Sequence, residues 1–113
     1  MGLPVLTETS SASDKASVTN NATEAAAVLK TLGHGGRLMI LCHLVAGEKS
    51  VGALEDLMEM RQAAVSQQLA RLRQDGLVIA RRDGKTVYYA LADDRPKQII
   101  ELVYDLFCSP RPD

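Results

Sequence analysis

The chain has 113 residues, of which 46% are hydrophobic and 24% charged, and its formal net charge is −1. This length suits one domain with one core, in a soluble globular protein. We find no apolar run near the roughly 20 residues of a membrane helix and no secretory signal pattern, so we expect a cytoplasmic protein without a membrane partner.

The N-terminal region divides near residue 20. Residues 1–20 are rich in Ser, Thr, Asn and small residues without sustained periodicity, which predicts a mobile arm. From residue 22 apolar residues recur at helical spacing and predict a first helix that ends at Gly33. We therefore expect one domain over residues 21–108, followed by a short tail at 109–113.

Two more helices are predicted after a turn at residues 34–36. The apolar stripe of the second helix, which stops before Gly47, comprises Leu38, Leu41, Cys42 and Val45. Ser50 is suited to cap a short third helix. Its expected inward-facing residues are Val51, Leu54, Leu57 and Met58.

A fourth helix follows a break at residues 59–61, and Gly76 ends it; its expected buried row is Val65, Leu69 and Leu72. Two β-rich runs, 77–82 and 86–91, join through Asp83-Gly84, which suits a tight two-residue hairpin turn. Pro96 fits the first turn of a last helix ending near Cys108. The apolar residues of that helix are Ile99, Ile100, Leu102, Val103, Leu106 and Phe107.

This order of elements predicts a mainly α-helical fold with a β-hairpin wing, the winged helix-turn-helix. The second helix of such a pair enters the major groove of DNA. Glutamine can pair with adenine, serine can bond to base edges or phosphate, and an alanine methyl can contact thymine. The candidate DNA-binding residues of the fourth helix are Gln62, Ala63, Ala64, Ser66, Gln67, Gln68 and Arg71.

The charge distribution agrees with DNA binding. Residues 61–90 contain six basic and two acidic residues, a local net charge of +4, which attracts phosphate although the whole chain is nearly neutral. Contacts at the hairpin tip would fix the register and give salt-dependent affinity. The candidates are Arg81, Arg82, Lys85 and Thr86. Of Tyr88 and Tyr89 we expect at least one to pack on the helices. A solvated charged face, and a winged helix used only for protein contacts, remain alternatives.

The run from Leu29 to Leu91 resembles the ArsR-type family of dimeric bacterial repressors. The most specific parts are AAVSQQLARLRQDGLV, which matches the recognition helix, and RRDGKTVYYAL, which matches the wing. The resemblance implies a homodimer formed largely by the first and last helices, an inverted-repeat operator and its release when an inducer is sensed. Independently, a last helix with apolar residues on more than one side would leave a monomer with an exposed patch that invites a partner.

The chain has two cysteines, Cys42 and Cys108. Many metal-sensing members of the family carry Cys-Val-Cys where this chain has Ser50-Val51-Gly52, and others use His ligands on the last helix, where this chain has none. The pair instead resembles the sulfide- and persulfide-responsive subgroup, which includes the biofilm-growth-associated repressors. That resemblance implies redox sensing by Cys42 and Cys108. A persulfide, polysulfide or thiol oxidant would join them through a disulfide or polysulfide, release the operator and derepress sulfide-detoxification genes.

Other roles for the thiols stay open. They can be small core hydrophobes. A repressor responsive to zinc or copper is a second alternative, with His34 and His43 as further candidate ligands, although Cys42 and His43 point about 100° apart on a helix. A thiol enzyme is a third, without Cys-x-x-Cys or a Ser/His/Asp pattern. We expect no catalytic residue, no cofactor and no resident metal.

Overall fold

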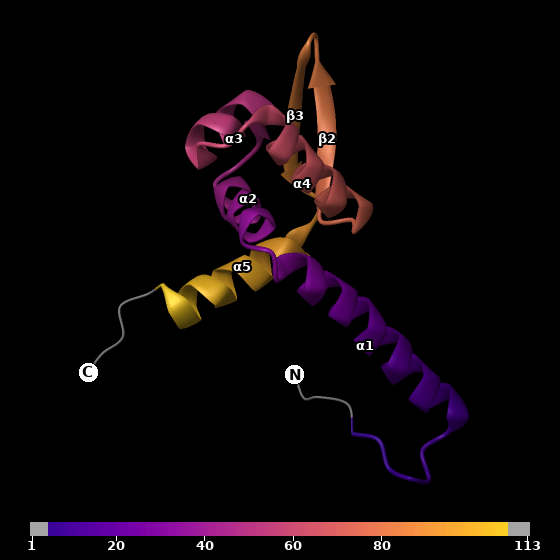
Figure 1. Cartoon of the computed structure of the whole chain (residues 1–113). Helices are drawn as coiled ribbons and strands as arrows, with labels where there is room; N and C mark the ends of the chain where they lie inside the picture. The colour runs from indigo at the N-terminus through magenta and orange to yellow at the C-terminus, as the bar shows by residue number, and fades with distance from the viewer. Residues whose placement is uncertain (1–4, 109–113) are drawn as a thin grey trace, which may run out of the picture.

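The computed structural model describes residues 5–108, so the expected tail at 109–113 and the first four residues of the expected arm lie outside the described residues. The elements in chain order are α1 (Ala12–Leu32), α2 (Gly35–Val45), β1 (Lys49–Ser50), α3 (Val51–Met58), α4 (Gln62–Gln74), β2 (Val78–Asp83), β3 (Thr86–Leu91) and α5 (Asp94–Phe107). Figure 1 shows α2, α3 and α4 grouped beside the β2–β3 hairpin, which projects as a wing. The predicted winged helix-turn-helix is confirmed.

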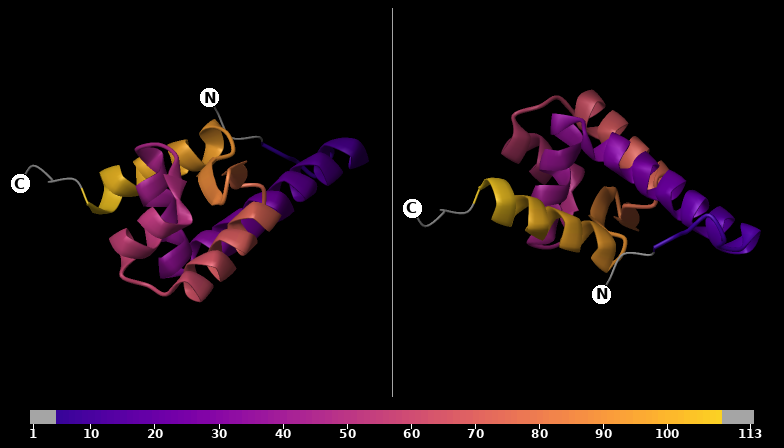
Figure 2. Two further views of the ribbon diagram at one scale, coloured as in Figure 1. Left: turned by 90° about the horizontal axis from the view of Figure 1, so that it is seen from above. Right: turned by 90° about the horizontal axis from the view of Figure 1, so that it is seen from below.

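The first helix begins at Ala12 rather than at residue 22, so the predicted start of the helix is wrong and residues 12–20, which were expected to belong to a mobile arm, are helical. The Ser11 side chain caps the helix by accepting a hydrogen bond from the backbone N–H of Asp14 at 3.0 Å, and Asp14 suits the positive end of the helix dipole. This half of α1 is almost entirely exposed and extends beyond the rest of the domain (Figure 2). Its residues therefore need no apolar stripe, which is why periodicity did not reveal it.

The core lies where α2, α3 and α4 meet the strands. The predicted row on α4 is fully buried, as expected. Leu57 is 51% exposed, which contradicts its predicted inward position; at about 100° per residue it lies further round α3 than Leu54, at the rim of the apolar stripe. The buried apolar residues are Leu32, Ile40, Leu41, Leu44, Leu54, Val65, Leu69, Leu72, Leu77, Val78 and Ile100.

The wing has a different turn from the predicted one. β2 and β3 pair from Val78↔Leu91 to Asp83↔Thr86, so the two turn residues are Gly84 and Lys85 rather than Asp83-Gly84. Gly84 has φ 62°, and Lys85 is not among the residues with positive φ. A positive φ at the first turn residue alone is the type II′ pattern, which requires glycine only there.

A third strand was not predicted. β1 pairs antiparallel with β3 through Lys49↔Tyr89 and Ser50↔Tyr88, which gives the strand order β1-β3-β2. Two residues are too few for an alternating pattern to be visible in the sequence. The pairing places the start of α3 directly beside the middle of β3.

Side-chain caps set where α3 and α5 begin. Ser50 caps α3 as predicted, because its hydroxyl accepts a hydrogen bond from the N–H of Ala53 at 3.0 Å. Asp93 caps α5 by accepting from the N–H of Arg95 at 2.9 Å, and Pro96 occupies the first turn. Within residues 5–108 no helix is both long and apolar enough to cross a membrane.

Candidate DNA interface and thiol groove

The outward face of α4 carries four of the predicted DNA-binding residues. Because α4 buries one row against the core, the opposite side of the helix faces solvent. Ala64 is half-buried and lies between the two sides. The exposed candidates on this face are Gln62, Ala63, Ser66 and Gln67.

Gln68 does not belong to this outward face. Its side-chain amide lies over Gly36 at the start of α2, where a Cβ atom would overlap it. The Gln68 Oε1 atom is buried and has no hydrogen-bond partner among the described residues. Position 68 follows the buried Val65 by three residues, so it shares the inner side of the helix.

Arg71 is tied to its own helix end. Its Nε atom lies 3.3 Å from Oδ2 of Asp75, and Asp75 also accepts a hydrogen bond from the hydroxyl of Thr31. The Thr31 hydrogen bond, more than the nearby Arg71 and Arg37 charges, holds the pKa of Asp75 below its ordinary value. Arg37 donates from Nε to the carbonyl oxygen of Thr31 at 2.8 Å. This Thr31–Asp75 cluster joins the ends of α1 and α4 to the start of α2.

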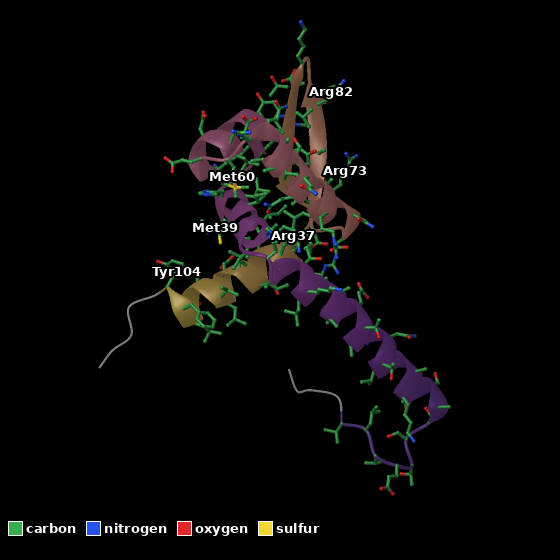
Figure 3. The ribbon with its side chains drawn as sticks, in the orientation of Figure 1. Arg37, Met39, Met60, Arg73, Arg82 and Tyr104 are labelled. Atoms are coloured by element: carbon green, nitrogen blue, oxygen red, sulfur yellow. The ribbon has the colours of Figure 1, made fainter. Side chains whose placement is uncertain are left out.

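On the wing, Arg82, Lys85 and Thr86 are exposed. Figure 3 shows Arg82 and Arg73 projecting from the wing and from α4 on the same side of the molecule. Arg73 is an exposed residue of the last turn of α4 that the sequence analysis did not select. Arg73 lies two residues after the candidate Arg71, and both are basic residues of the last turn of α4. This basic last turn is the sequence feature that could have indicated Arg73 as a DNA-binding candidate.

Arg81 is placed differently from the other predicted wing residues. It forms an ion pair with Glu48, at 2.6 Å between Nη2 and Oε1, and its guanidinium carbon lies 4.7 Å from the centre of the Tyr88 ring. Tyr89, on the other face of the hairpin, packs partly against the core, which confirms that one tyrosine supports the helices.

The two thiols line one groove between α2 and α5. The groove has a volume of about 440 Å³, and both cysteines are free and exposed at its surface. The core side of α2 is formed by other residues, so the expectation that Cys42 lies on the buried stripe is wrong. The groove is lined by Leu38, Met39, Cys42, Val45, Ile100, Glu101, Val103, Tyr104, Asp105 and Cys108. Figure 3 shows Met39 and Tyr104 on the side where α2 meets α5.

The position of Cys42 in the groove affects the pKa of its thiol. Packing beside the apolar side chains of the groove raises the pKa of Cys42, and the Cys108 thiol raises it further because two negative charges in one groove repel. A hydrogen bond to the backbone acts in the opposite direction. Cys108 ends α5, where its N–H donates to the carbonyl of Tyr104 at 2.8 Å.

Comparison with known proteins identifies the family. The protein-family model described as "Bacterial regulatory protein, arsR family" matches residues 34–80 of this chain. A biofilm growth-associated repressor from Agrobacterium fabrum is 49% identical over 89 residues, which cover 79% of this chain and 76% of the relative. This chain belongs to the ArsR family of bacterial regulatory proteins. As an ArsR-family protein it is a DNA-binding transcriptional regulator rather than an enzyme.

Solved ArsR-family structures share the fold. The structure of reduced HlyU from Vibrio cholerae has a TM-score of 0.78 and 42% identity, and the match covers 82% of this chain and 98% of that chain. The repressor BigR from Xylella fastidiosa has a TM-score of 0.77 and 41% identity, with 85% and 98% of the two chains covered. HlyU from V. cholerae is named a transcriptional activator, so relatives of both regulatory directions exist.

Proposed function

We propose that this ArsR-family protein is a thiol-responsive transcriptional repressor, which binds DNA as a reduced homodimer and releases it when Cys42 and Cys108 become linked. The observation that carries the proposal is the groove that both thiols line between α2 and α5. α2 packs against both α5 and α4. A bond within the groove therefore acts on a helix that contacts the recognition helix.

The proposed DNA contacts come from α4 and the wing. Gln62, Ala63, Ser66 and Gln67 face solvent together on α4, as base-reading residues must. Arg82, Lys85 and Thr86 on the wing supply contacts to phosphate. Among the other candidates, Ala64 lies at the margin of the α4 face, and Arg71 is exposed but paired with Asp75, so we assign it a lesser role in contacting DNA.

The homodimer is supported by apolar side chains that the single chain leaves exposed on its first and last helices. They lie on α1 and α5, the two helices that extend from the domain (Figure 1). Two copies related by a twofold axis would cover this surface and present two recognition helices to an inverted repeat. These exposed side chains are Leu29, Leu102, Tyr104, Leu106 and Phe107.

The proposed chemical step is the oxidation of two thiols by one persulfide. A thiolate attacks the terminal sulfur of the persulfide and releases a thiol, which leaves a cysteine persulfide. The second cysteine then attacks this species at the protein-bound sulfur and releases sulfide. The protein thiols lose two electrons and two protons overall, and the products are one disulfide, one thiol and one hydrogen sulfide. With a polysulfide as the donor, extra sulfur atoms would remain in the bridge between Cys42 and Cys108.

The energy that regulation requires sets a scale for such a link. Full reversal of a two-state equilibrium from 1:99 to 99:1 needs about 5.5 kcal/mol, and a partial reversal needs less. The roughly 2–4 kcal/mol that a disulfide closing a long loop contributes is stability of the folded over the unfolded chain. The link would therefore act on DNA binding by changing how α2 packs against α5 and α4, which both contact it.

The experiment compares four proteins on one duplex, selected from a random-sequence pool by the reduced wild-type protein. They are the wild type, Cys42→Ser, Cys108→Ser and the double variant, each measured reduced and after treatment with a persulfide donor. We expect all four to bind when reduced and only the wild type to release DNA, with intact mass showing loss of two hydrogens or gain of sulfur. Release from either single variant would overturn the assignment of the pair.

Regulatory direction and the metal alternative have their own tests. A reporter driven by a promoter containing the selected duplex should be repressed by the reduced protein, whereas activation would contradict the repressor assignment. No group of three His, Cys, Asp or Glu side chains comes together within residues 5–108. The zinc- or copper-responsive alternative stays a prediction, and adding each metal to the reduced protein in the same DNA-binding assay tests it.

A further inference from the structure

We infer that Arg81 positions the wing by binding Glu48 and Tyr88, and that the phosphate contacts of the wing come from its neighbours Arg82 and Lys85. This inference rests on the DNA binding in the proposed function but not on the thiol chemistry. It reverses the sequence-based expectation, in which Arg81 was one of several equivalent basic residues at the wing tip.

The guanidinium of Arg81 is engaged on its edge and on its face. Its Nε donates to Oε2 of Glu48 at 3.0 Å, and its Nη2 donates to Oε1 at 2.6 Å. This two-point geometry is the strong form of an arginine–carboxylate pair. The face of the guanidinium lies over the Tyr88 ring, at 4.7 Å from the ring centre, a cation–π arrangement. Nη1 lies 3.9 Å from Asp83.

The strand register explains why these three side chains meet. Arg81 and Tyr88 are direct partners in the β2–β3 pairing, and Ser50 is the partner of Tyr88 on the other side. Glu48 immediately precedes β1, so Arg81 reaches Glu48 across Tyr88. The Glu48–Arg81–Tyr88 cluster therefore connects all three strands on one face of the sheet. Arg82 is the next residue of β2 and points to the opposite face.

The cluster leaves Arg81 a poor partner for phosphate. The pair with Glu48 is neutral as a unit, and a phosphate that approached Arg81 would also meet the Glu48 carboxylate. The bonds with Arg81 lower the pKa of Glu48, so the carboxylate remains charged at neutral pH. Arg82 and Lys85 form no ion pair within residues 5–108, and each is exposed.

The cluster also ties the wing to the helix-turn-helix. Glu48 leads into β1, and Ser50 at the end of β1 is the N-cap of α3. A connection from Arg81 to Glu48 therefore fixes the hairpin relative to the first helix of the pair, and through it relative to α4. Exposed ion pairs usually contribute little, but a two-point pair that also stacks on a ring restricts orientation. The cluster thus sets where Arg82 and Lys85 meet the DNA backbone.

Salt dependence of DNA binding tests this division of roles. Affinity of the full-length reduced protein for the selected duplex is measured over a range of salt concentrations. The slope of log affinity against log salt is negative, and removing one phosphate contact makes it less steep by about 0.9. We expect Arg82→Gln and Lys85→Gln to make the slope less steep. Arg81→Gln should lower affinity several-fold with the slope unchanged. An Arg81→Gln slope that becomes as shallow as that of Arg82→Gln would overturn the inference.

Two variants that change Glu48 distinguish the two roles of Arg81. If Arg81 contacted DNA, Glu48→Gln would remove a repelling charge and raise affinity, whereas we expect affinity to fall. The charge exchange Glu48→Arg with Arg81→Glu leaves the net charge unchanged and can restore the pair. We expect this double variant to bind several-fold better than Arg81→Glu alone, and equal binding would refute the positioning role. Circular dichroism and thermal unfolding of every variant confirm that the compared proteins are folded.

Discussion

The hydroxyl of Thr31, in the last turn of α1, donates a hydrogen bond to the carboxylate of Asp75, which follows α4. Thr31 is completely buried, and Arg71 and Arg37 complete the Thr31–Asp75 cluster. The helix proposed to form the dimer is therefore joined by a polar contact to the helix proposed to read DNA.

Replacing Thr31 by valine should destabilise the domain. Valine preserves the shape of the side chain but removes the donor to Asp75, and a hydrogen bond to a charged group contributes about 1.5–3 kcal/mol. Urea unfolding of reduced protein, at matched concentrations, measures the change. Thr19→Val is the control, because Thr19 is exposed on the same helix. A loss no greater than that of the control would show that the contact is dispensable.

The lowered pKa of Asp75 predicts how this contribution depends on pH. A carboxyl whose pKa is lower in the folded protein adds stability above its unfolded pKa, about 3.9, and that stability is lost as pH falls through the folded value. The unfolding free energies of wild type and Asp75→Asn should therefore differ by a constant amount near neutral pH and converge below about pH 4. A difference that grows on acidification would contradict the direction of the pKa change.

Gly36→Ala should be tolerated despite the overlap with Gln68. The overlapping atoms belong to the flexible end of the Gln68 side chain, whose buried oxygen has no partner to lose within residues 5–108. Alanine is favoured over glycine in a helix by about 0.5–1 kcal/mol. We expect a stability change within about 1 kcal/mol of zero, and a larger gain from Gly36→Ala in a Gln68→Ala background. Equal effects in the two backgrounds, by chemical unfolding, would show that the residues do not interact.

Glu59→Gly should stabilise the protein. Glu59 ends α3 in the left-handed region, with φ 52° and ψ 43°, and the next N–H, from Met60, donates to Glu55 at 3.2 Å. A residue with a side chain is disfavoured there by roughly 1–2 kcal/mol, while glycine costs about 0.4–1 kcal/mol through the unfolded state. We expect a net gain of a few tenths to about 1 kcal/mol. Asp56→Gly, inside the same helix, should instead destabilise it.

Cys42 should react slowly with alkylating reagents. The thiolate is the reactive form, and the raised pKa of Cys42 reduces its fraction at neutral pH. Iodoacetamide labelling followed by mass spectrometry over a range of pH should show a rate for Cys42 that rises at higher pH than in an unstructured peptide. In Cys108→Ser this rise should move to lower pH, because the repelling thiolate is gone. An unchanged profile would mean that the two thiols do not interact.

The elements with one buried face were predictable from the sequence. α4 shows its buried row at helical spacing, and the wing shows two β-rich runs around Gly84, so both were located to within a few residues. The exposed half of α1 has no buried side to impose a period. β1 is defined by its partners Tyr88 and Tyr89 rather than by its own residues, which is why pattern analysis missed it.

The sequence indicated which segments carry the candidate site residues better than it indicated which way the individual side chains point. Glu48 and Arg81 are 33 residues apart, so no local pattern distinguishes Arg81 from Arg82. Gln68 and Gln67 are likewise adjacent and chemically identical, and only the packing of α4 against Gly36 separates them. α2 is apolar on more than one side, which is why Cys42 could be assigned to the core when it lies in the groove.

The strand order β1-β3-β2 leaves the outer edge of β2 without a hydrogen-bonding neighbour among the described residues. An open edge is a template for strands of other molecules, and charged side chains along it discourage such pairing. Arg81, Arg82 and Asp83 occupy the distal half of β2. The charges of the wing thus also protect the protein from aggregation through its sheet.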